Sequence, residues 1–178
     1  MYDPLAEFLG ATEGGIIEYG YFDAVRLAGH SCPTVASAYW MTCKALASLY
    51  PDAMPVRGDI LVEFSQGGTS GVTGVIANVV SMLTGAMSDN GFKGIAGRFD
   101  RRDKLFFAME MPGEMRFTRL DTRRAINTAA NLQRSPCFAA HARADIRLSG
   151  RQRNAGRSRR IPEAVARTGA QRPAGSWQ

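Results

Sequence analysis

The chain changes character along its length, and that change limits where a folded core can form. Residues 1–98 carry five Lys and Arg against nine Asp and Glu, whereas residues 99–178 carry seventeen basic residues against seven acidic ones. From residue 135 onward, Arg, Ala, Gly and Ser dominate and no clean periodicity is visible. Such a composition buries too little apolar surface to offset the entropy lost on ordering. We therefore predict an α+β core domain over residues 1–122 and a poorly ordered tail over residues 123–178.

Capping signals and apolar spacing predict the helices of the core region. Asp3 stands before Pro4, a favoured pair for a helix start, and Gly29 is a natural helix stop. A later stretch, residues 72–83, is apolar nearly all round, which is typical of a helix buried on every side. A dimer interface would be a suitable place for it. The predicted helices cover residues 3–9, 21–28, 34–50 and 72–83.

Alternating apolar residues predict the strands. The clearest case is residues 59–64, where Ile60, Val62 and Phe64 would point to the same side. Residues 95–99 and 105–110 are predicted to pair as a hairpin across a charged turn, and residues 114–120 add another strand. Together they predict an antiparallel sheet of about four strands that packs against the apolar helices.

The sequence Gly-His-Ser-Cys-Pro-Thr at residues 29–34 is the strongest functional signal. Pro33 suits the first position of the following helix, which puts Cys32 at the N-cap. Free backbone N–H groups and the positive end of the helix dipole favour the thiolate form of a thiol placed there. Thiolate is the form that binds metals and attacks electrophiles, and the imidazole of His30 lies only two residues away.

Three interpretations of this motif stay open. His30 and Cys32 can bind a transition metal, with zinc the expected ion, or Cys32 can be the nucleophile of a metal-free thiol enzyme with His30 as its base. Alternatively, Cys32 is a small buried apolar side chain. The loop over residues 85–94 offers Asp89 as a further metal ligand and Lys93 to bind an anionic group of a small substrate. Whether the protein is an enzyme is left open.

The motif resembles the Gly-His-x-Cys-Pro signature of the formylmethanofuran dehydrogenase E family. A second block is similar to that family: a helix from Val75 ending in Leu-Thr-Gly, then a glycine-rich loop that contains Lys93. The resemblance covers about residues 15–120. Three positions depart from the family pattern, since this chain has Ala28, Asn78 and Ala86 where the family often has a histidine, an acidic residue and a cysteine.

The resemblance implies an α+β core that forms an intertwined homodimer and holds a metal ion. It is also compatible with an accessory role to a redox complex. Some members of the family carry an additional zinc-finger domain. This chain contains no Cys-x-x-Cys pair, so that domain is not expected here.

Composition excludes other classes of protein. No apolar run is long enough to cross a bilayer, and residues 1–9 lack the basic start of a secretory signal. Three cysteines do not make a disulfide framework, so a reducing cytoplasm is the expected location. The arginines of the tail can act as a nucleic-acid-binding arm, but no aromatic residues interleave with them for base stacking. A disordered tail or an altered reading frame explains them better.

Overall fold

The computed structural model describes residues 1–130 of the chain. No helix in this range is long and apolar enough to cross a membrane. In chain order the elements are α1 (Pro4–Phe8), the 3₁₀ turn η1 (Glu13–Gly15), α2 (Tyr21–Ala28), α3 (Pro33–Leu49), β1 (Ile60–Phe64), α4 (Thr73–Thr84), β2 (Leu105–Phe106), β3 (Met115–Arg119) and β4 (Ala125–Thr128).

The structure confirms the four predicted α-helices. Local signals at the ends of these helices determine where they begin and end. The carboxylate of Asp3 accepts hydrogen bonds from the first backbone N–H groups of α1. Helices α2 and α4 both end at a glycine in the left-handed conformation, Gly29 with φ 76° and Gly85 with φ 72°. Cys32 is the N-cap of α3 and Pro33 is its first residue, as predicted.

The sheet is mixed, which corrects the prediction of an antiparallel one. Its strand order is β2-β1-β3-β4, and β1 pairs in parallel with β2. The pairs β1–β3 and β3–β4 are antiparallel. Between β1 and β2 the chain passes through α4 and a long loop, and such a crossover is what a parallel pair requires.

The predicted hairpin between residues 95–99 and 105–110 is wrong. Residues 95–98 turn back on themselves, because the backbones of Ile95 and Arg98 exchange both hydrogen bonds at 2.9 Å. Ala96 and Gly97 between them have φ values of 50° and 75°, as a tight turn with two left-handed residues requires. Of the second predicted strand, only Leu105 and Phe106 form a strand, and they pair with β1.

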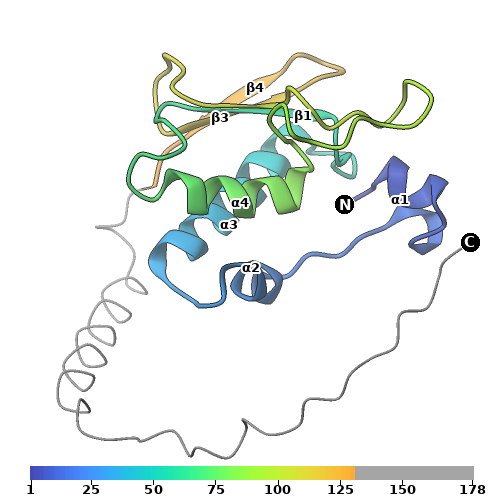
Figure 1. Ribbon diagram of the computed structural model, residues 1–178, viewed down its shortest axis with the longest axis horizontal. Coiled ribbons are helices and arrows are strands. Elements are labelled where there is room, and N and C mark those ends of the chain that lie inside the picture. Colours follow the sequence, from blue (N-terminus) through green and yellow to red (C-terminus); the bar gives the residue numbers. More distant parts are fainter. Residues whose placement is uncertain (131–178) are drawn as a thin grey trace, which may run out of the picture. The chain divides into compact units, whose positions relative to one another are not determined.

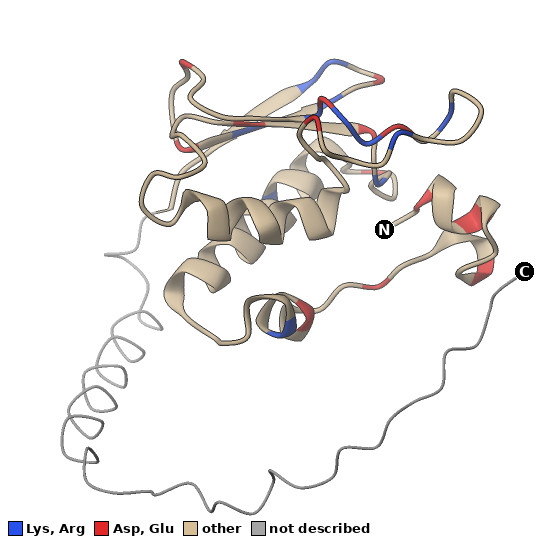
Figure 2. Ribbon diagram, in the orientation of Figure 1, with Lys and Arg blue, Asp and Glu red and all other residues tan. Residues whose placement is uncertain are grey.

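Helices α3 and α4 cover one face of the sheet, and the main core lies between these two layers (Figure 1). Ile60, Val62 and Phe64 of β1 are buried against α3 and α4 together with Met115 and Phe117 of β3. A second apolar cluster joins α2, α3 and α4. Helix α4 has no charged residue and α3 has only one (Figure 2).

Strand β4 lies beyond residue 122, where the sequence signal for the core ended. It is an edge strand whose residues alternate between exposed and half-buried, so its sequence carries little apolar periodicity. Backbone pairing to β3, from Met115–Thr128 to Thr118–Ala125, defines it instead. The arginine-rich part of the predicted tail lies outside the described residues.

Candidate functional site

The predicted site is the connection between α2 and α3, where His30 and Cys32 lie two residues apart. Gly29 turns the chain out of α2, and Cys32 has the extended backbone of an N-cap residue. Between them, Ser31 shares a hydrogen bond with the hydroxyl of Tyr21 at 2.8 Å. The connection is therefore tied to the first turn of α2.

His30 is exposed, and one of its ring nitrogens has a defined partner. Nδ1 lies 2.9 Å from the carbonyl oxygen of Ala28. A carbonyl oxygen only accepts hydrogen bonds, so Nδ1 must carry the proton in the neutral ring. The lone pair then resides on Nε2, and this arrangement is the usual one for a histidine that binds a metal.

Cys32 is half-buried and packs beside the apolar cluster of α2, α3 and α4. Its thiol forms no capping hydrogen bond to α3. Cys43, further along α3, provides a contrast within the same helix. Burial raises the pKa of the Cys43 thiol, although a hydrogen bond with Tyr39 acts in the opposite direction. Cys43 is therefore a packing residue with a suppressed thiolate.

The structure does not assemble a complete metal centre from residues 1–130. Nowhere in this range do three His, Cys, Asp or Glu side chains converge in a group that could hold a metal ion. Asp89 thus does not join His30 and Cys32, and both Asp89 and Lys93 are exposed. The loop that carries them is bound to the chain before β2, since the N–H of Met87 donates to the carbonyl oxygen of Arg101 and the carbonyl oxygen of Met87 accepts from the N–H of Lys104.

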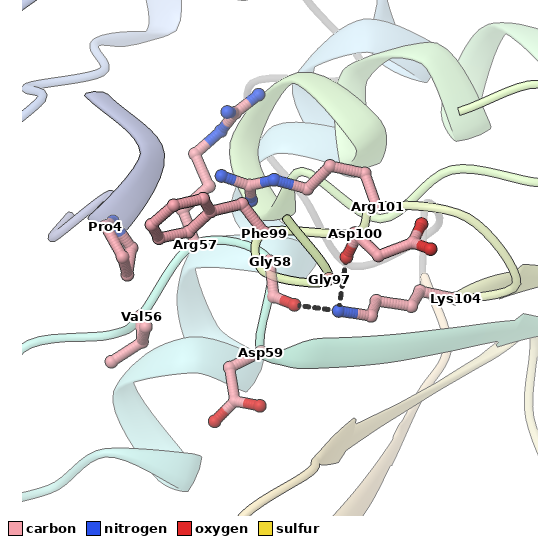
Figure 3. A pocket seen from close by; sticks show the side chains of 10 residues that line it. All are labelled: Pro4, Val56, Arg57, Gly58, Asp59, Gly97, Phe99, Asp100, Arg101 and Lys104. Atoms are coloured by element: carbon pink, nitrogen blue, oxygen red, sulfur yellow. Dashed lines mark hydrogen bonds between the residues drawn. The ribbon is translucent and has the colours of Figure 1, made fainter. Parts of the chain in front are cut away.

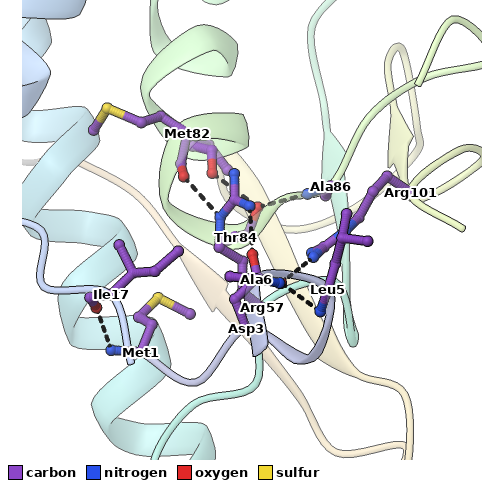
Figure 4. Close-up of polar contacts among 11 residues, drawn as sticks. Met1, Asp3, Leu5, Ala6, Ile17, Arg57, Met82, Thr84, Ala86 and Arg101 are labelled. Carbon is purple, nitrogen blue, oxygen red and sulfur yellow. Dashed lines mark hydrogen bonds and ion pairs between the residues drawn. The ribbon is translucent and has the colours of Figure 1, made fainter. Parts of the chain in front are cut away.

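A different cluster of charged residues, which sequence patterns did not reveal, centres on Asp3 (Figure 4). One carboxylate oxygen lies 2.7 Å from Nη2 of Arg101, and the other lies 2.8 Å from Nη1 of Arg57. Burial alone would raise the pKa of Asp3, but the hydrogen bond from Arg57 and the charge of Arg101 hold it below its ordinary value. One carboxylate therefore caps α1 and binds two guanidinium groups.

Arg101 is buried, with only 5% of its surface exposed. Two glycines leave the space that its guanidinium occupies, because a Cβ atom at either Gly58 or Gly85 would collide with Nη1. Nη1 itself has no hydrogen-bond partner within the described residues. Burial lowers the pKa of Arg101, and the charge of Asp3 partly offsets this effect.

Beside this cluster lies a pocket of about 410 Å³ (Figure 3). Lys104 is at its wall, where the ammonium donates to the carbonyl oxygens of Gly58 at 2.5 Å and of Asp100 at 2.7 Å. Burial and the neighbouring charge of Arg101 lower the pKa of Lys104. The lining residues are Pro4, Val56, Arg57, Gly58, Asp59, Gly97, Phe99, Asp100, Arg101 and Lys104.

Sequence reasoning missed this second region because its residues come from distant segments. Asp3 and Arg101 are 98 positions apart, and the stretch from Asp100 to Lys104 has the composition of a solvated turn. The only signals in the sequence were weak ones. Arg57 stands next to Gly58, and a run of five charged residues extends from Asp100 to Lys104.

Comparison with known proteins adds no further identification. No family model matches the chain, and no curated protein or solved structure is found to be similar to it. The resemblance of residues 29–34 to the formylmethanofuran dehydrogenase signature therefore stays a prediction from the motif.

Proposed function

We propose that the protein binds a transition-metal ion through Nε2 of His30 and the thiolate of Cys32. The observation that carries this proposal is the contact between Nδ1 of His30 and the carbonyl oxygen of Ala28. It fixes the ring so that Nε2 presents its lone pair, and ring nitrogens held in this way are typical of metal ligands. An imidazole and a thiolate together suit zinc or another borderline-soft ion.

Two donors are only half of the ligands of a tetrahedral site. A structural zinc needs four protein ligands, and a catalytic zinc needs three and a water. We propose that the same pair from a second copy supplies the remainder, so that a homodimer holds one ion between two His-x-Cys motifs. Exposed apolar side chains on the adjoining helices support such an association, since Phe22 is 73%, Leu27 50% and Trp40 57% exposed.

Elemental analysis of the purified full-length chain tests the metal. A shared site predicts one ion per two chains, lost in both His30→Ala and Cys32→Ala. Cys43→Ala is the matched control, because it removes a thiol from the same helix and should leave the metal content unchanged. Asp89→Asn decides whether the loop contributes a ligand. Absence of metal in the wild-type protein, or its retention in both site variants, would refute the proposal.

A metal-free thiol enzyme is the second candidate, and the N-cap position of Cys32 favours it. Cys32 stands beside the first backbone N–H groups of a 17-residue helix, which have no acceptor within that helix. In this alternative His30 is the base and Lys93 binds an anionic substrate group. Metal-free protein would then keep a fast reaction of Cys32 with alkylating agents, which His30→Ala would slow.

A further inference from the structure

The pocket beside Asp3 combines cationic and apolar surfaces. Arg57, Arg101 and Lys104 contribute the positive charge, and Pro4 and Phe99 contribute apolar surface. A volume of about 410 Å³ lies within the range of small-molecule binding sites. Neither His30 nor Cys32 lines this pocket, so it is a different site from the α2–α3 connection.

The charged side chains that line the pocket are three cations, Arg57, Arg101 and Lys104, and two carboxylates, Asp59 and Asp100. Asp3 is already shared by two guanidinium groups. The two carboxylate oxygens of Asp100 accept hydrogen bonds from Nε of Arg102 at 3.1 Å and from Nη2 of Arg102 at 2.7 Å. Lys104 pairs with no carboxylate in residues 1–130 and binds only backbone carbonyl oxygens. The charges of Asp59 and Asp100 offset the cost of burying Lys104 only in part, so an anion in direct contact with the ammonium would stabilise it further.

Lys104 also has a donor to spare. An ammonium group carries three N–H bonds, and the carbonyl oxygens of Gly58 and Asp100 accept two of them. Those two bonds hold the side chain at the pocket wall, and its last N–H has no acceptor among residues 1–130. The group is half-buried, so a hydrogen bond to a charged acceptor there is screened less than at the surface.

The apolar side of the pocket is held in an unusual conformation. Phe99 has φ 64°, a left-handed value that a residue with a bulky side chain rarely adopts. Its ring packs on Phe8 with ring centroids 5.3 Å apart, which keeps it over the pocket. Strained backbone of this kind is retained where the surrounding structure gains from it, and ligand sites are a common case.

We propose that this pocket binds a small organic carboxylate. The carboxylate accepts the free N–H of Lys104 in the positive field of Arg57 and Arg101, and the apolar part of the ligand lies against Pro4, Val56 and Phe99. Asp59 also lines the pocket, and its negative charge limits the site to ligands with a single charge. Phosphate is expected to bind less well, because a large share of it carries a second negative charge at neutral pH and it has no apolar part to lie against Pro4, Val56 and Phe99.

Calorimetric titration of the full-length protein with benzoate tests the proposal, because benzoate has one carboxylate and an aromatic body. Benzamide, a neutral molecule of the same shape, should bind at least tenfold more weakly, roughly the effect of losing a charge-assisted hydrogen bond. Inorganic phosphate is the second comparison ligand. Benzoate binding that is undetectable in the millimolar range, or no stronger than that of benzamide or phosphate, would overturn the proposal.

Two variants move the affinity in opposite directions. Lys104→Met keeps the length of the side chain and should weaken benzoate binding about tenfold. Asp59→Asn removes the competing charge and should tighten it about threefold. Lys44→Met, on the exposed face of α3, is the matched control and should leave the affinity unchanged. If Lys104→Met fails to fold, Asp59→Asn still decides, because unchanged or weaker binding in that variant contradicts an anion in the pocket.

Discussion

The α2–α3 connection is conspicuous in the sequence, whereas the cluster around Asp3 is evident only in the structure. His30 and Cys32 stand out in the sequence, yet in the structure they are two donors, one of them exposed. Asp3, Arg57 and Arg101 are inconspicuous in the sequence, yet they form a buried ion network. A local motif places reactive groups next to each other along the chain, whereas a network built from distant segments is defined only by folding.

This contrast predicts that the Asp3 cluster matters most for stability. Replacing Asp3 by Ala leaves two guanidinium groups without their shared carboxylate and removes the cap of α1. Breaking a buried ion pair from one side costs about 3–5 kcal/mol of unfolding free energy. Urea denaturation followed by circular dichroism measures the loss. Asp89→Ala, in the exposed loop, is the control and should leave the midpoint unchanged.

The pH dependence of the same pair of proteins checks the mechanism. Because the pKa of Asp3 in the folded state is below its ordinary value of 3.8, its contribution is present above that value and is lost as the pH falls through the depressed one. The stability gap between wild type and Asp3→Ala should therefore narrow in acid. A gap that stays constant down to acid unfolding would show that the network contributes by packing and not by charge.

Gly29 in the α2–α3 connection and Gly85 beside Arg101 both end a helix in the left-handed conformation, so the two regions can be compared by the stability lost when each glycine is replaced. Gly29 and Gly85 have nearly equal φ values, 76° and 72°, but a Cβ at Gly29 would meet nothing within 4 Å whereas one at Gly85 would meet Arg101. Gly29→Ala should cost about 1 kcal/mol, the strain of the left-handed conformation alone. Gly85→Ala should cost about 2–4 kcal/mol, because the buried guanidinium must also move.

Thermal and urea unfolding of both variants provide the measurement. Equal losses would mean that Arg101 relocates without cost, and the network would then be less rigid than its contacts indicate. A larger loss of unfolding free energy in Gly29→Ala than in Gly85→Ala would mean that the α2–α3 connection, and not the surroundings of Arg101, tolerates an added side chain less well.

The same contrast explains which parts of the fold the sequence could predict. The helices were predictable because Asp3 caps α1, Gly29 ends α2 and Pro33 determines the start of α3. Strands β1 and β3 were predictable because their alternate residues are buried. The parallel pairing of β2 and the edge strand β4 depend on partners elsewhere in the chain, and no local pattern encodes them.

The candidate sites divide in the same way. Cys32 was correctly placed at an N-cap, because Pro33 determines the start of α3. The sequence predicts Arg101 and Lys104 in the charged turn of a hairpin, because five consecutive charged residues run from Asp100 to Lys104. Their burial follows from the distant Asp3 and from the space left by Gly58 and Gly85.

The smallest expected effect is a difference in reactivity between Cys32, the N-cap of α3, and Cys43 within α3. It tests the role of the α2–α3 connection. Burial raises the pKa of Cys43, so little of its thiolate is present near neutral pH. Cys32 lies at the N-cap of the same helix, before its first turn. Iodoacetamide should therefore modify Cys32 at least about tenfold faster than Cys43 in metal-free protein, as site-resolved mass spectrometry would measure.

Added zinc should then protect Cys32 and leave the rate at Cys43 unchanged. Equal rates at the two sites would favour Cys32 as an apolar packing residue, whereas a fast Cys32 that zinc does not protect would favour the thiol enzyme over the metal site.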